Sequence, residues 1–212
     1  MKKQYRVQAG GATLVALLLV AMYFVPLPAG LTYPGLEVLR GDVSLPAADL
    51  AGYLRAMQII FALDGIFLAA QLLAWSGIAQ VVRTRAPLPG SLVLSLGVAG
   101  VLLDLAENSI IWAALGSLQT GHLPAPGWLI AWKTVHHLSY LLPLLAAVMA
   151  GANLWSPRWT ERLACLVGTL FSALAIAGLY LPELAPLADL WYLAWFAAAA
   201  LLLWDSSNII ET

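Results

Sequence analysis

Hydrophobic residues occur along this chain in six long runs, separated by short segments rich in charge, proline or glycine. Each run approaches or exceeds the roughly 20 apolar residues that a helix needs to cross a bilayer. Since lipid offers no partners for backbone N–H and C=O groups, such runs are predicted to be helices. The sequence predicts an all-α integral membrane bundle, a single transmembrane domain over 1–212, with six spans at about 7–25, 53–80, 91–117, 128–152, 163–181 and 188–204.

The composition supports a membrane-embedded chain. Of the 212 residues, 62% are hydrophobic and 10% are charged, against about 45–50% and about 25% in an ordinary soluble domain. A net charge of −1 provides no basic surface for nucleic acid. The single cysteine, Cys165, excludes an internal disulfide and a multi-cysteine metal site.

The distribution of positive charge predicts the orientation. Seven lysines and arginines fall on one side of the predicted spans: Lys2, Lys3, Arg6, Arg83, Arg85, Arg158 and Arg162. Cytoplasmic loops carry an excess of such residues, so both termini are predicted to be cytoplasmic, in a bacterial inner membrane. The first run follows a basic segment as in a signal peptide, but its length favours a retained anchor.

The connections between the runs are short, with one exception. Residues 26–52 form an outward-facing loop in which prolines and glycines indicate turns. Pro46 followed by Asp49 is typical of a first helical turn, so an interfacial helix is expected from about residue 46 into the second span. With no separate soluble domain predicted, any chemistry is expected within the membrane or at its faces.

Ionisable residues interrupt three of the predicted spans. The third span carries Asp104, Glu107 and Asn108 at i, i+3 and i+4, which places them on one helical face. The second span contributes Asp64. The fourth has a similar stripe at i, i+3, i+4 and i+7, formed by Lys133, His136, His137 and Tyr140.

A buried ionisable residue costs roughly 2.5–3.5 kcal/mol at mid-span on insertion scales, so these groups are expected to meet in one polar cluster in the outer half of the bilayer. The three carboxylates and Lys133 leave two negative charges when the histidines are neutral. Protons, a metal ion, a cationic ligand or water must compensate for this charge. Protonation of His136 or His137 near neutral pH is one such source.

Several roles remain open for these residues. Asp104 and Lys133 are expected to pair, either as a structural ion pair or as part of a site. Glu107 with His136 or His137 is the candidate set for a metal ion, although adjacent histidines point about 100° apart on a helix.

Asp64 and Asn108 have a structural alternative as well. Asp64 is either a proton acceptor or a neutral acid that is hydrogen-bonded to a neighbour. Asn108 is expected to form a helix–helix hydrogen bond more readily than a ligand contact.

The pattern "LLDLAENSIIW" followed one span later by "WKTVHHLSYLL" resembles uncharacterised small bacterial polytopic membrane proteins. In that pattern Asp-x-x-Glu-Asn on one helix precedes a lysine on the next. The resemblance implies that Asp104, Glu107, Asn108 and Lys133 belong together, and it implies no reaction and no cofactor. The His-x-x-x-His spacing of ceramidase-related membrane hydrolases is missing from this sequence.

Three classes of function fit these observations. The first is a membrane protein that binds or transports a small cationic or protonatable ligand through the polar residues. The second is a metal-dependent intramembrane enzyme acting on lipid. The third is an accessory or assembly subunit of a larger membrane complex. The expected partners are accordingly the lipid bilayer, a small molecule or cation, or other membrane subunits. We favour the first.

Overall fold

The computed structural model describes residues 2–25, 47–120, 122, 126–178, 181 and 185–209. Within these ranges every regular element is a helix: α1 (Lys2–Tyr23), α3 (Ala47–Arg83), α4 (Pro87–Gln119), α5 (Pro126–Ala152), α6 (Trp159–Leu166), the π-helix η1 (Val167–Phe171), α7 (Ser172–Gly178) and α8 (Ala185–Ile209).

The prediction of an all-α fold with six span-length apolar helices is confirmed. The stretches long and apolar enough to cross a membrane are Lys2–Tyr23, Ala51–Arg83, Pro87–Ser117, Gly127–Ala152, Trp159–Ala177 and Leu190–Asn208. Most of the predicted outer loop, residues 26–46, lies outside the described residues. The helix expected from about residue 46 is the beginning of α3, which starts at Ala47 and continues without interruption to Arg83.

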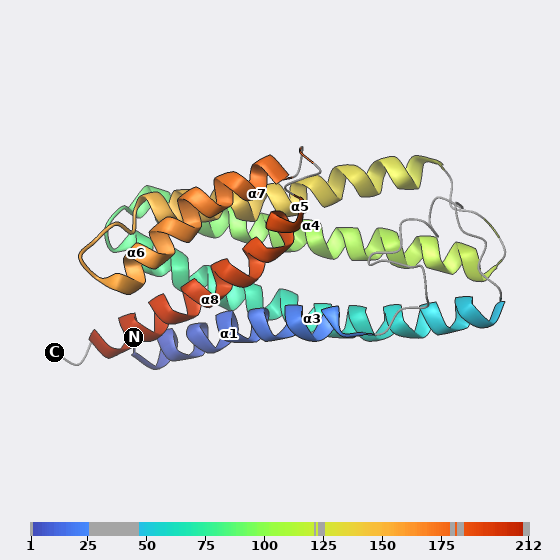
Figure 1. Ribbon diagram of the computed structural model, residues 1–212, viewed down its shortest axis with the longest axis horizontal. Coiled ribbons are helices and arrows are strands. Elements are labelled where there is room, and N and C mark those ends of the chain that lie inside the picture. Colours follow the sequence, from blue (N-terminus) through green and yellow to red (C-terminus); the bar gives the residue numbers. More distant parts are fainter. Residues whose placement is uncertain are drawn as a thin grey trace.

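The spans form a ring in which each helix packs mainly against two neighbours, and α3 also contacts α8 across the ring. Starting from α5, the ring passes through α4, α3, α1 and α8 and returns to α5 through α6, η1 and α7. Both ends of the chain lie at the same end of the bundle, next to α6 (Figure 1). At the opposite end α3, α4 and α5 extend past the end of α7 and the start of α8 (Figure 1). Among the described helices that follow α1, only α3, α4 and α5 therefore reach the end opposite the termini.

The fifth span differs from the single α-helix expected over 163–181, because η1 lies between α6 and α7. The Ser172 hydroxyl donates to the Val167 carbonyl at 3.4 Å and accepts the Trp191 indole N–H at 2.7 Å. Gly168 lies so close to α5 that an added Cβ would be 2.6 Å from the Ala147 carbonyl oxygen. The wider π turn thus occurs where the backbone of the fifth span lies close to α5 at Gly168. At the same place the Ser172 hydroxyl donates a hydrogen bond to a backbone carbonyl group.

Two hydrophobic cores fill the ring. The larger one lies toward the termini and contains fully buried aromatic side chains of α3 and α8: Trp75, Trp191, Trp195 and Phe196. The smaller one lies between the far ends of α3, α4 and α5 and is formed by Tyr53, Met57, Ile60, Ile111, Leu115 and Trp132.

Charged and polar side chains join the turn after α3, the start of α6 and α8 at the end of the bundle where the termini lie. Glu161 is buried and accepts from Arg85 at 2.5 Å and from Arg158 at 3.3 Å, and the Ser156 hydroxyl also donates to it. Thr160 donates to Asp205 at 2.8 Å, which joins α6 to α8. The turn after α3 and the start of α6 are therefore held together by one carboxylate.

We expect Gly168→Ala to lower the free energy of unfolding by about 1–3 kcal/mol, because the new methyl group would overlap a backbone carbonyl of α5 that cannot rotate away. The matched control is Gly10→Ala on the exposed face of α1, where an added Cβ meets nothing within 4 Å. Thermal unfolding of the purified protein in detergent measures both. Equal midpoints for the two variants would contradict the proposed close contact of α5 with η1.

Candidate functional site

A layer of polar side chains separates the two hydrophobic cores on three neighbouring helices. On α3, Asp64 lies between the core residues Ile60 and Phe67. On α4, Asp104 and Glu107 lie between Val101 and Ile111. On α5, His136 and Ser139 follow Trp132 and precede Leu144. We name Asp64, Asp104, Glu107, Asn108, His136 and Ser139 the polar layer.

Asp64 and Asn108 connect α3 to α4 within this layer. The Asn108 amide nitrogen Nδ2 donates a hydrogen bond to Asp64 Oδ2. Asp64 is buried, with 4% of its surface exposed. This contact confirms the interpretation of Asn108 as a residue that forms a helix–helix hydrogen bond, and it gives the buried carboxylate one donor.

Glu107 connects α4 to α5. Its Oε1 lies 2.8 Å from His136 Nδ1, and its Oε2 accepts from the Ser139 hydroxyl at 3.0 Å. Glu107 is 6% exposed, and Ser139 is buried as well. Because both carboxylate oxygens have partners on the same face of α5, this side chain sets the register between the two antiparallel helices.

Aromatic rings surround His136. The Trp132 ring stacks on the imidazole at 4.7 Å with an interplanar angle of 19°. The Tyr140 ring lies 5.0 Å away on the next turn, and Tyr192 of α8 lies 5.3 Å from Tyr140. These rings hold the imidazole in one orientation against Glu107, and they bring the predicted residue Tyr140 into the site.

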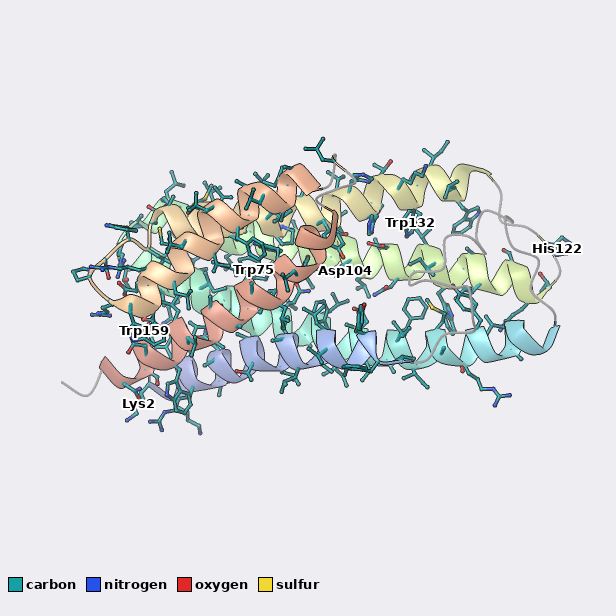
Figure 2. The ribbon with its side chains drawn as sticks, in the orientation of Figure 1. Lys2, Trp75, Asp104, His122, Trp132 and Trp159 are labelled. Carbon is teal, nitrogen blue, oxygen red and sulfur yellow. The ribbon has the colours of Figure 1, made fainter. Side chains whose placement is uncertain are left out.

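Asp104 lies one turn closer to the termini than Glu107. Figure 2 shows it near the middle of the long axis of the bundle. It is half-buried, and its charge interacts with those of Asp64 and Glu107. Tyr192 also lies close enough to these three acids for an electrostatic interaction with each of them. Three carboxylates from two helices thus share one region of the bundle.

The expected ion pair between Asp104 and Lys133 is not formed among the described residues. Lys133 is exposed, and Trp132 beside it in sequence lies nearer to the His122 end of the bundle than Asp104 does (Figure 2). The reason is the register set by Glu107. Asp104 lies on the side of this contact that faces the termini, whereas Lys133 lies on the opposite side of it. The two residues are therefore about 10 Å apart along the long axis of the bundle. Lys133 is also rotated by about 120° from Ser139 around α5.

His137 does not join His136 in the site. Its Nδ1 contacts the Lys133 carbonyl oxygen of its own helix at 2.7 Å, its side chain is exposed, and its ring is inclined at 88° to that of His136. Within the described ranges, no three histidine, cysteine, aspartate or glutamate side chains gather where they could hold a metal ion. Of the candidate metal ligands, Glu107 and His136 contact each other instead.

Sequence analysis missed three residues of the site. Ser139 follows His136 by three positions and shares its face, so its helical spacing was a usable signal. Trp132 stands four positions before His136, so helical spacing places it on the same face as well. Tyr192 belongs to the last span, and nothing in the sequence places its ring against that of Tyr140 on α5.

Comparison with known proteins gives no relative: no family model, curated protein or solved structure matches the chain.

His136→Ala is expected to lower the free energy of unfolding by about 1–3 kcal/mol, because it removes a hydrogen-bond partner of the buried Glu107 carboxylate and the stacking with Trp132. The matched control is His137→Ala, which removes an exposed ring that contacts only its own helix in the described structure. Thermal unfolding in detergent compares the two variants. The assignment of His136 to the site would be wrong if both variants behaved alike.

Lys133→Met is expected to change the free energy of unfolding by less than about 0.5 kcal/mol, as for most exposed substitutions. The same unfolding measurement tests this, with His136→Ala as the destabilised reference. If Lys133→Met were the more damaging of the two, the ion pair with Asp104 would have to exist after all.

Proposed function

We propose that this chain is a small polytopic membrane protein that binds or transports a small cationic or protonatable ligand at the polar layer of α3, α4 and α5. One observation supports the proposal above all. Asp64, Asp104 and Glu107 lie close enough together for their charges to interact. Among the described residues, none of the three forms an ion pair with a lysine or arginine.

The energy of such an arrangement requires positive charge from elsewhere. Isolated charges in a medium of low dielectric constant are strongly destabilising, and like charges at short range add repulsion. His136 can supply one positive charge through its contact with Glu107. Protons on the acids or a bound cation must supply the rest, which makes proton release on cation binding the expected chemistry.

The contacts also suggest how protons and cation exchange. When His136 is protonated, the Glu107–His136 pair is neutral and the acid charge that attracts a cation is reduced. A cation near Asp64 and Asp104 disfavours protonation of the neighbouring groups through its own charge. Histidine is suited to this role because its protonation changes near neutral pH.

The distribution of charge at the two ends of the bundle supports the proposed orientation. Both termini lie at the end that carries the cluster of Arg85, Arg158 and Glu161 (Figure 1). We assign this end to the cytoplasm of a bacterial inner membrane, by the same excess of positive residues that the sequence shows. The polar layer then faces the outer half of the bilayer. Exposed apolar side chains such as Ile66, Leu102 and Leu170 fit a surrounding lipid phase.

The test is a titration of the full chain, purified in detergent and weakly buffered near neutral pH, with putrescine, choline and ethylammonium in turn. A pH-sensitive dye reports proton release, and calorimetry reports binding. We expect saturable binding of at least one cation with release of protons, and weakening of about tenfold or more in Asp104→Asn and in Glu107→Gln, since each tenfold step corresponds to about 1.4 kcal/mol.

Asp205→Asn is the matched control, because Asp205 is a carboxylate that lies away from the polar layer, at the end of the bundle where the termini lie. The Asn side-chain oxygen can still accept the hydrogen bond that Thr160 donates to Asp205. Cation binding that all three variants retain, or no binding of any of the three cations, would overturn the proposed function.

A further inference from the structure

A groove opens between α3 and α4 on the flank of the bundle, next to the polar layer. Its volume is about 330 Å³, within the range of about 300–1,000 Å³ that small-molecule sites occupy. Its apolar lining comes from Phe61, Gly65 and Leu68 of α3 and from Leu105 and Trp112 of α4.

The polar part of the groove is formed by Asn108 together with Gln58 and Ser109. Since Nδ2 of Asn108 donates to Asp64, its Oδ1 is the atom left to accept a hydrogen bond, and no described residue donates to it. The Asp64 carboxylate lies directly behind this amide. A ligand in the groove thus meets a carbonyl acceptor backed by a negative charge, which favours a cationic N–H donor.

The remaining walls are apolar and aromatic. Phe61 and Trp112 meet edge to face with their ring centroids 5.5 Å apart, and half of the Trp112 surface is exposed. Leu68 is buried and Leu105 is exposed, so the wall continues from the protein interior to the flank. At Gly65 an added Cβ would meet nothing within 4 Å, so this glycine leaves the middle of the groove open.

We propose that this groove binds an amphiphilic primary ammonium compound. The ammonium group donates to Asn108 near Asp64, and the hydrocarbon body lies against Phe61 and Trp112, with access from the lipid phase. Charge complementarity with the uncompensated carboxylates and the aromatic walls together select this occupant. The inference rests on the proposed function and specifies its ligand class. A free alkylamine and an aminophospholipid share this chemistry.

The experiment compares octylammonium with ethylammonium, which have the same head group, in equilibrium binding to the full chain in detergent. We expect octylammonium to bind about tenfold or more tightly than ethylammonium, because its hydrocarbon chain is buried in the groove. Gly65→Leu fills the groove and is expected to reduce the ratio of the two affinities to near one. The matched control is Gly116→Leu on α4, where an added Cβ also meets nothing within 4 Å, and it keeps the ratio.

A second variant, Trp112→Ala, keeps the groove testable if Gly65→Leu fails to fold. Trp112→Ala removes half-exposed aromatic wall without filling the groove, and it is expected to weaken octylammonium binding more than ethylammonium binding. Native mass spectrometry then distinguishes the sources of the ligand. Retention of phosphatidylethanolamine over phosphatidylglycerol, lost in Gly65→Leu, assigns the groove to a lipid, and octylammonium binding without lipid retention assigns it to a free amine.

Equal affinities for the two ammonium ions, unchanged by Gly65→Leu and by Trp112→Ala, would overturn the groove and leave the carboxylate site in place. Cation binding that Asp104→Asn and Glu107→Gln both retain, or no cation binding at all, would overturn the proposed function itself, and the groove with it. The two failures are therefore distinguishable.

Discussion

The contact of Glu107 with His136 and Ser139 is the interaction on which the arrangement of α4 and α5 depends. Both carboxylate oxygens accept from the same face of α5, at 2.8 Å and 3.0 Å. A buried carboxylate that lost these donors would have no water to replace them, so the register between α4 and α5 is strongly specified. That register decides which other polar groups can meet. It brings Asp104 toward Tyr192 and moves Lys133 away to an exposed position.

The polar layer is energetically costly because it lies between two hydrophobic cores. The aromatic residues of α3 and α8 are buried toward the termini, and the smaller core around Tyr53 and Trp132 is buried on the other side. Acids held in such a layer respond strongly to a nearby positive charge, because little solvent screens it. The same features that make the layer unfavourable in an empty bundle make it sensitive to a proton or a cation.

The groove on the flank of α3 and α4 meets this layer at Asn108. Asn108 takes part in both regions, since it contacts Asp64 on one side and lines the groove on the other. A ligand at the groove would change the surroundings of Asp64 through this single amide. Gly65 contributes by the absence of a side chain, which is a feature that only the packing of α3 against α4 makes meaningful.

The sequence by itself determined the fold class, the number of spans and the residues that had to be explained, because each of these follows from local composition and helical periodicity. The i, i+3 and i+4 spacing of Asp104, Glu107 and Asn108 predicted that they share one face of α4. Only the tertiary structure decided their partners. The side chains of Lys133 and His136 lie on adjacent turns of one helix, yet an axial offset of a few residues between α4 and α5 selects the histidine and leaves the lysine exposed. Such an offset is set by contacts between helices, and no periodicity within one helix encodes it.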